Sequence, residues 1–534
     1  MNDLENLELP EHIDILDFFP HEEYRQYQKQ TILEIRDYFK AGYEFVILES
    51  PTGSGKSAIG LTTGLYYNKA YLLTSQKILQ TQYENEYASS DIKILKGKNN
   101  YPCIFLDGKE TCDNGFCLIG KCPVRSDCFY EIAKREAMGS KIALMNYTYF
   151  LNVMKYTTVF KERNVLILDE AHNVEKILMG FIEFSFSTAY LSRLGITSKI
   201  PDYENVSQYI PWMIEVQKKI NQLMATIVDQ LAKFKEESTL YEDKIKELSK
   251  EIEMLERLND KVQNFLDSYN QTEWIFDIAV NEKLKRKTIT FKPLTVSYFA
   301  RSFLFQYCDK KILMSATILD KDNFCKSLGI PFDKAIFIQN PSTFPASIRP
   351  IYLTNSGKMN KTEIDGALPN IVADINKILN HHNNEKGLIF TNTYKIAKYI
   401  QENLENNFKR RLMLHDENNR DDVLDKFMKS QGPKVLMSPS MYEGIDLKDD
   451  LARFVVIVKI PYLFLGDKQI KRRMETDYDW YIWKAALILV QAAGRGVRHK
   501  EDECTTYIMD SGTRWFLMKN KKFFPQYFLD AIKN

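Results

Sequence analysis

The sequence has no apolar run of membrane-spanning length and almost no net charge. Its 72 lysines and arginines face 71 aspartates and glutamates, so any nucleic-acid binding must use local basic patches. The acidic N-terminal segment MNDLENLELPEH lacks the pattern of a signal peptide. Of only eight cysteines, five fall between Cys103 and Cys128. We therefore expect a cytoplasmic protein with no membrane partner, in which clustered thiols bind metal and do not form disulfides.

The stretch FVILESPTGSGKS, residues 45–57, is the strongest local signal in the chain. Four apolar residues have the length of a buried strand, and a glycine-rich turn follows them. Glycines let backbone N–H groups approach phosphate oxygens, Lys56 can reach the β- and γ-phosphates, and the Ser57 hydroxyl can ligate Mg²⁺. A following helix would direct its positive end at the phosphates. The pattern predicts a nucleotide site at Gly53, Ser54, Gly55, Lys56 and Ser57.

A second apolar run, residues 165–168, leads directly into Asp169 and Glu170. At the ligand edge of a sheet, Asp169 can hold the Mg²⁺ shell and Glu170 can orient and polarise the attacking water. Upstream, Arg25 and Gln28 are three residues apart, so on a helix they would share a face. A glutamine amide can read the edge of adenine, whereas an ordinary solvated helix face is the alternative for this pair.

A second α/β unit is indicated by strand-like runs at 387–390, 435–438 and 454–458. It is followed by the segment QAAGRGVR, which contains Gln491, Arg495 and Arg498. The two arginines are three apart, so a helical turn would aim both the same way. Two guanidinium groups aimed at a phosphate from another domain would act as arginine fingers. A surface arginine pair is the alternative.

The spacing of the clustered cysteines indicates a metal site. Cys117, Cys122 and Cys128 form a compact x4, x5 pattern, Cys103 is the natural fourth ligand, and Cys112 is a spare. Four thiolates suit tetrahedral zinc or an iron–sulfur cluster, and the spacing alone does not distinguish the two. Buried cysteines without a metal are the third possibility.

Residues 180–288 differ in character from the segments around them. Apolar residues recur near heptad spacing, with lysine and glutamate between them. This pattern predicts an antiparallel helical hairpin with a small core of its own, inserted into the nucleotide-binding domain. Its seam consists of Ile245, Leu248, Ile252, Leu255, Val262, Leu266 and Tyr269.

The segments SPTGSGKS, DEAHN, SAT, YEGID and QAAGRGVR, in that order, resemble those of a superfamily 2 helicase. With the clustered cysteines, the set is similar to the iron–sulfur helicases of the XPD/Rad3 and DinG family. The resemblance implies an α/β fold of two RecA-like motor domains, with an iron–sulfur insertion and a helical arch in the first. The implied boundaries are 1–97, 136–179 and 289–335 for motor domain 1, 98–135 for the cluster domain, 180–288 for the arch, and 336–534 for motor domain 2.

The same resemblance implies an ATP-dependent DNA helicase that moves 5′→3′ on single-stranded DNA, unwinds forked duplexes and acts in DNA repair. The expected localisation is the cytoplasm in association with the nucleoid, or the nucleus in a eukaryote. Any repair-protein partners are unknown. Two alternatives stay open: an RNA helicase, which shares every motif, and an ATP-driven switch that remodels a protein complex with a zinc-stapled module. The implied cofactors are ATP, Mg²⁺ and a 4Fe–4S cluster. The implied ligands of the cluster are Cys103, Cys117, Cys122 and Cys128, and the implied nucleotide-site residues include Arg25, Gln28, Gly444 and Asp446.

Overall fold

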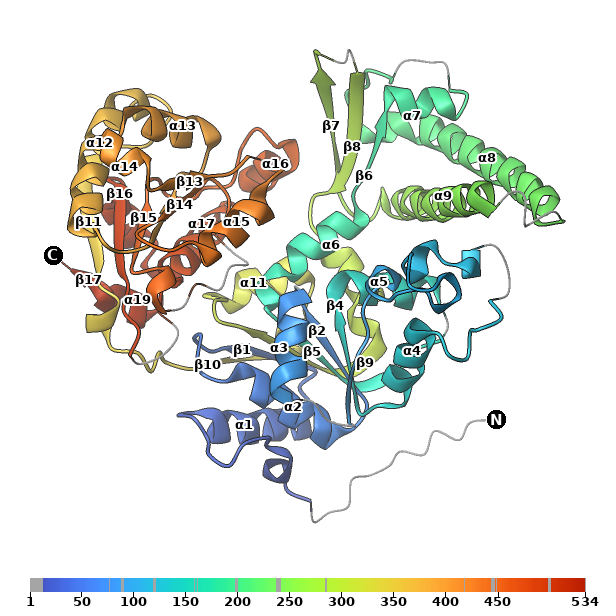
Figure 1. Cartoon of the computed structure of the whole chain (residues 1–534), viewed down its shortest axis with the longest axis horizontal. Coiled ribbons are helices and arrows are strands. Elements are labelled where there is room, and N and C mark those ends of the chain that lie inside the picture. The colour runs from blue at the N-terminus through green and yellow to red at the C-terminus, as the bar shows by residue number, and fades with distance from the viewer. Residues whose placement is uncertain are drawn as a thin grey trace.

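The computed structural model contains two α/β domains and an inserted third body (Figure 1). It describes residues 13–533, except 76, 88–90, 119–121, 158, 161, 197–199, 237–241, 284–285, 417, 443–446, 448 and 498–500. Among the described residues, no helix is long and apolar enough to cross a membrane.

The first α/β domain, which we call motor domain 1 after the expectation from the sequence, is built on a seven-stranded parallel sheet. Its central strands are buried at nearly every position, because helices cover both faces of a parallel sheet. In spatial order the strands are β10 (Ala335–Gln339), β1 (Phe45–Glu49), β9 (Cys308–Ser315), β5 (Arg163–Asp169), β2 (Ala70–Thr74), β4 (Ile142–Asn146) and β3 (Ile92–Ile94). The helices are α1 (Gln28–Lys40), α2 (Lys56–Tyr67), α3 (Lys77–Tyr87), α4 (Phe129–Gly139), α5 (Tyr147–Tyr156), α6 (Val174–Ile182), α10 (Ser297–Phe303) and α11 (Lys321–Leu328).

Motor domain 2 has a parallel sheet of the same size. Its strands are β13 (Leu412–Leu414), β14 (Val435–Ser438), β12 (Gly387–Phe390), β15 (Phe454–Ile457), β16 (Thr505–Asp510), β11 (Ile351–Gly357) and β17 (Ile532–Lys533). Its helices are α12 (Ile364–His381), α13 (Tyr394–Asn403), α14 (Asn406–Lys409), α15 (Arg420–Lys429), α16 (Lys468–Thr476), α17 (Tyr478–Ala493), α18 (Thr513–Lys519) and α19 (Gln526–Ala531). The expected boundary at 335 falls on the first residue of β10, which pairs with β1, so the chain changes sheets only after Gln339.

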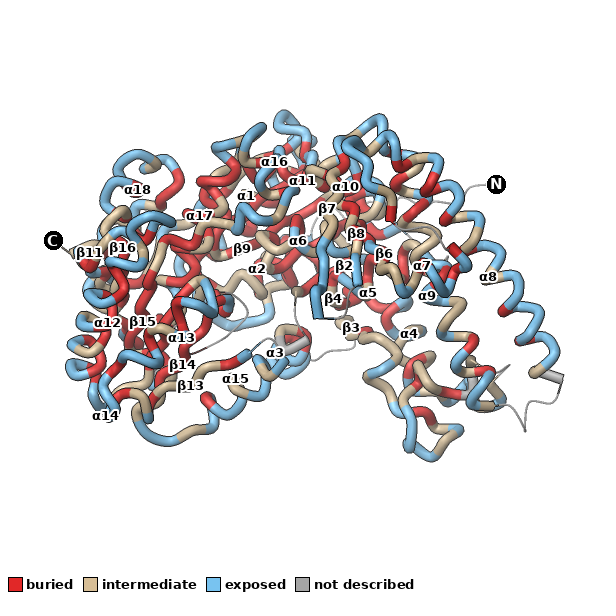
Figure 2. The backbone as a smooth tube through the Cα atoms, turned by 90° about the horizontal axis from the view of Figure 1, so that it is seen from above, coloured by how far each residue is buried: buried red, intermediate tan, exposed pale blue. Residues whose placement is uncertain are grey.

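The arch rises beside motor domain 1, and its long helices point away from the core (Figures 1 and 2). The predicted helical hairpin is present, with Ile245, Leu248, Leu255 and Val262 buried along its seam. The structure adds a three-stranded antiparallel sheet that crosses the expected boundary at 288. The elements are β6 (Phe184–Ser187), α7 (Thr188–Arg193), α8 (Ile210–Glu236), α9 (Glu242–Ser268), β7 (Trp274–Asn281) and β8 (Arg286–Pro293).

Candidate active site and nucleic-acid interface

The phosphate loop lies between β1 and α2. Gly53 and Gly55 have φ values of 76° and 80°, the left-handed region that glycine adopts without strain. At Gly55 a side chain would also collide with Gln28, whose Nε2 lies 2.0 Å from the place of an added Cβ. The Lys56 ammonium donates to the carbonyl of Ser50 at 2.9 Å and so lies across the loop. The sequence therefore forms the strand, loop and helix that its pattern predicted.

Arg25 and Gln28 both contact this loop, although not from one helix face as the spacing suggested. Helix α1 begins at Gln28, and Tyr27 before it has a left-handed φ of 69°, so Arg25 lies outside the helix. Arg25 Nη1 donates to the Gly53 carbonyl at 2.6 Å, and Gln28 Nε2 donates to the Gly55 carbonyl at 3.1 Å. Both side chains therefore support the backbone that would surround the phosphates.

Asp169 ends β5 and is buried beside two tyrosine hydroxyls. Tyr83 donates to Asp169 Oδ2 at 3.1 Å, and Tyr147 donates to the Asp169 carbonyl at 2.8 Å. Burial and the neighbouring Glu170 raise the pKa of Asp169 to about 6. Tyr83 also hydrogen-bonds to Ser57, so the two predicted magnesium ligands converge on one phenol. Their hydroxyl and carboxylate oxygens fit a hard divalent cation.

A chain of hydrogen bonds connects the DEAH and SAT segments. Asn173 Nδ2 lies 3.0 Å from His172 Nε2, within hydrogen-bond distance. His172 Nδ1 lies 2.8 Å from Ser315 Oγ and 3.3 Å from the Glu170 carboxylate. Ser315 Oγ in turn donates to the Thr317 carbonyl at 3.1 Å. A change at Glu170 can therefore reach the turn that follows β9.

The predicted finger segment departs from a continuous helix. Helix α17 ends at Ala493 and Gly494 is its C-cap, so Arg495 lies in a turn, where its Nε donates to the Tyr442 carbonyl at 2.8 Å. Gln491 is buried in the last helical turn, and its Oε1 has no hydrogen-bond partner among the described residues. Arg498, Gly444 and Asp446 lie outside the described residues.

The five clustered cysteines are all free thiols and lie in one short segment between β3 and α4. Cys112 is within hydrogen-bond reach of Cys117 and Cys128, so the predicted spare lies as near to the set as the predicted ligands. The contact with Cys112 lowers the pKa of Cys117 to about 6, which favours the thiolate that metals bind. Within the described part of the chain, no three potential ligands are placed to hold a single ion. The chemistry of the donors still fits a cluster, because cysteine thiolates are the ligands that iron–sulfur clusters take.

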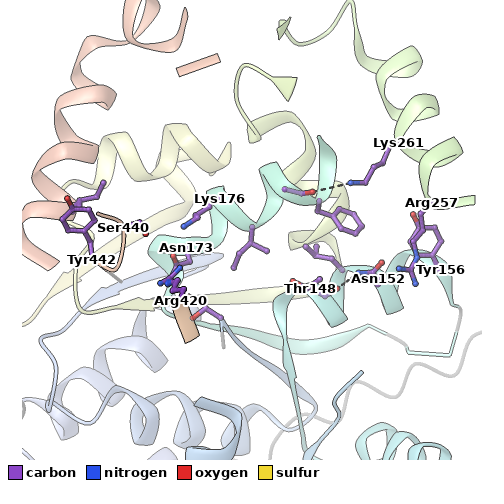
Figure 3. Close-up of a pocket in the computed structure, with 16 residues that line it drawn as sticks. Thr148, Asn152, Tyr156, Asn173, Lys176, Arg257, Lys261, Arg420, Ser440 and Tyr442 are labelled. Carbon is purple, nitrogen blue, oxygen red and sulfur yellow. Dashed lines mark hydrogen bonds between the residues drawn. The ribbon is translucent and has the colours of Figure 1, made fainter. Parts of the chain in front are cut away.

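A cleft of about 750 Å³ opens between the two motor domains and the arch (Figure 3). Four cationic side chains line it: Lys176 of α6, Arg257 and Lys261 of α9, and Arg420 of α15. The aromatic residues of its lining are Tyr156, Phe181 and Tyr442. Cations that track a backbone, combined with aromatic faces on which bases stack, are typical of single-strand binding. Sequence reasoning could not find this set, because its members come from distant segments with no shared motif.

The cysteine segment and the arch contact each other through α9. Ser249 Oγ of α9 donates to the carbonyl of Leu118 at 3.0 Å, and Lys250 contacts Asn114. About three turns further along α9, Lys261 Nζ donates to the Glu183 carbonyl at 2.8 Å, and Tyr156 hydrogen-bonds to Asp260. The arch helix α9 is therefore held both by the cysteine segment and by motor domain 1.

Comparisons with known proteins agree with this geometry. The Helicase C-terminal domain family matches residues 375–529, and the family described as Type III restriction enzyme, res subunit, matches residues 21–210. The ATP-dependent DNA helicase YoaA of Escherichia coli is 21% identical over 91% of both chains. YoaA of Haemophilus influenzae is also 21% identical, over 92% of this chain and 90% of that protein.

Solved structures show the same fold. An XPD helicase superimposes with a TM-score of 0.63 at 16% identity, over 94% of this chain and 98% of that one. Xpd4 of S. tokodaii gives a TM-score of 0.58 at 14% identity, over 95% and 99% of the two chains. The domain-family matches in both halves of the chain, the DNA helicases aligned over nearly its whole length and the fold shared with XPD structures all agree with the resemblance to the XPD and DinG helicases.

Proposed function

We propose that this chain is an ATP-dependent DNA helicase that translocates on single-stranded DNA and unwinds forked duplexes. The observation that carries the proposal is the basic and aromatic cleft, which begins beside the ATPase motifs. Asn173 and Lys176 line it only a few residues after the DEAH segment, and Ser440 and Tyr442 line it from motor domain 2. A strand in this cleft would therefore contact the parts that move when ATP is bound and hydrolysed.

Both motor domains would contribute residues to the ATP site. Ser57 and Asp169 would hold magnesium, which neutralises phosphate charge when it is bound, and Lys56 would contact the β- and γ-phosphates. Glu170 would orient the attacking water from the end of β5. Gln491, Arg495 and Arg498 would meet the charge that develops on the transferred phosphoryl group when the domains close.

The strand would be held by phosphate contacts and by stacking. Arg257, Lys261 and Arg420 would pair with phosphates, while Tyr156 and Tyr442 would stack on bases from opposite ends of the cleft. Cys103, Cys117, Cys122 and Cys128 would hold a 4Fe–4S cluster that cross-links a polar segment beside the arch. Movement in the 5′→3′ direction and action in DNA repair also belong to the proposal and rest on the family likeness.

The proposal is tested by hydrolysis and strand binding with the purified protein. ATP turnover should rise with single-stranded DNA more than with RNA of the same length, and a forked duplex should separate in the presence of ATP. Stimulation by RNA alone would favour the RNA helicase. A wild type that ignores both nucleic acids and responds only to a protein partner would favour the remodelling switch.

A matched pair of variants on α9 tests the cleft itself. Arg257 lines the cleft, whereas Lys244 lies on the same helix outside it and pairs with Glu247. Arg257→Ala should remove one phosphate contact and reduce the slope of log affinity against log salt by about 0.7 for a single strand. Lys244→Ala should leave that slope unchanged. An unchanged slope in Arg257→Ala would contradict this path for the strand.

A further inference from the structure

Helix α17 of motor domain 2 contacts motor domain 1 at the turn after the SAT segment. The indole Nε1 of Trp483 donates to the carbonyl of Ile318 at 2.8 Å. The Trp483 side chain is only 1% exposed, so the bond is shielded from water. It is a directional hydrogen bond between the domains, and it lies two turns before Gln491 on the same helix.

The turn that accepts this bond is itself held by the strand that leads into the phosphate loop. Glu49, the last residue of β1, accepts the backbone N–H groups of Ile318 and Leu319 through Oε2, each at 2.5 Å. Its other oxygen accepts Gln339 Nε2 at 2.7 Å. Leu319 has a left-handed φ of 68°, an unfavourable conformation for leucine that these contacts maintain. The turn is therefore held in one geometry by the strand that leads into the nucleotide site.

The same turn also receives the DEAH segment. Ser315 Oγ connects His172 to the backbone at Thr317, one residue before the carbonyl that Trp483 contacts. Residues 315–319 thus contact the P-loop strand through Glu49, the DEAH segment through His172, and motor domain 2 through Trp483. We refer to these residues as the SAT turn.

We propose that Trp483 is a positioning residue for ATP hydrolysis: its bond to the SAT turn keeps α17, and with it Gln491 and Arg495, in register with the DEAH segment. The inference deepens the proposed function and rests on the part of it that has motor domain 2 complete the ATP site. Residues at the end of α17 can stabilise the transition state only if the whole helix is correctly placed, because small displacements of catalytic groups reduce rates strongly.

The chain provides a matched control for this bond. Trp480 lies one turn earlier on α17 and is 4% exposed, yet its Nε1 has no hydrogen-bond partner among the described residues. Trp483→Phe and Trp480→Phe therefore remove the same ring volume from the same buried helix. Phenylalanine at 480 keeps an aromatic face beside Arg473, so only Trp483→Phe removes a hydrogen bond to motor domain 1. Steady-state hydrolysis should be measured for both variants with and without single-stranded DNA.

In Trp483→Phe, kcat should fall about tenfold in both conditions while KM for ATP stays within twofold, the loss expected for about 1.4 kcal/mol of positioning energy. Trp480→Phe should stay within twofold of the wild type in both parameters. Equal losses in the two variants, normal kcat in Trp483→Phe, or a raised KM with normal kcat would each overturn the inference. If Trp483→Phe does not fold, benzothienylalanine at position 483 keeps the shape without the N–H and gives the same test.

The same measurements distinguish a failure of the proposed function from a failure of the inference about Trp483. A wild type whose turnover ignores DNA would refute the helicase, while its DNA-free kcat would still decide the role of Trp483. A wild type without any ATP hydrolysis would refute both.

Discussion

A buried charge cluster between the motor domains gives a quantitative prediction. Glu175 of α6 pairs with Arg473 of α16 and with Lys484 of α17, the latter at 2.7 Å. The Arg473 guanidinium also donates to Ser327 Oγ at 3.0 Å and lies 3.8 Å from the ring centre of Trp480. One carboxylate thus pairs with two cations from the opposite domain, and all three groups are largely withdrawn from water.

The pKa of Glu175 gives the size of the effect. Burial by itself would raise that pKa, but the two cations outweigh burial and hold it at about 2 instead of 4.5. This difference means that the folded protein prefers the charged form over a neutral one by about 3 kcal/mol. Glu175→Gln resembles the neutral acid, so it should weaken the contact between the domains by about that amount at pH 7.

Hydrogen exchange of the amides in α16 and α17 measures this loss, because exchange from local opening reports its free energy. A loss of about 3 kcal/mol predicts exchange roughly a hundredfold faster in Glu175→Gln. The control is Glu273→Gln, since Glu273 pairs with the adjacent Arg472 at 2.7 Å, but both side chains are more than 40% exposed. That surface pair should contribute little, because water and salt screen it.

The pH dependence has a definite sign. Because the folded pKa of Glu175 is depressed, its stabilisation is complete above pH 4.5 and is lost as the pH falls toward 2. The difference between wild type and Glu175→Gln should therefore shrink across that range. Exchange in Glu175→Gln within threefold of the wild type at pH 7, or an equal effect of Glu273→Gln, would refute the reasoning.

Three further predictions concern the ATP and cysteine sites. Glu170→Gln should reduce ATP turnover at least about a hundredfold yet still bind nucleotide, as a fluorescent ATP analogue would show, because it impairs only water activation. Arg498→Ala should lower kcat about a hundredfold and the affinity for ATP far less, since the charge that it meets grows in the transition state; equal losses in a binding and turnover comparison would contradict this role. Cys122→Ser should lose iron, visible absorbance and unwinding but keep some DNA-stimulated ATPase, whereas Cys112→Ser should keep its iron by elemental analysis; the reverse result would reassign the ligands.

Local chemistry explains why the ATP motifs could be predicted. The apolar run before the P-loop, its glycines and Lys56 determine a strand, a turn and a helix without help from distant residues. The run into Asp169 behaves in the same way at the end of β5. The local sequence of these segments is enough to predict their structure, because buried parallel strands and glycine turns have strong local signatures.

The remaining features depend on tertiary structure. Arg25 and Gln28 meet the phosphate loop through a left-handed residue at Tyr27, which the spacing of the pair could not reveal. The end of α17 at Ala493 had a signal in Gly494, a residue common at helix ends, but the arginine spacing suggested a longer helix. The cleft and the Trp483 contact join residues that are far apart in sequence, so only the folded chain brings them together.

The stem of the arch has a consequence for how such proteins acquire new parts. The chain leaves motor domain 1 along β6 and returns along β8, and the two strands pair from Phe184 with Phe291 to Ser187 with Thr288. The points at which the chain enters and leaves the arch are therefore adjacent. Insertions with adjacent ends disturb the host domain little. An ancestral motor could have gained this body in a single insertion event. By the same geometry, an engineer could exchange the arch for an unrelated module whose termini end in a β-hairpin.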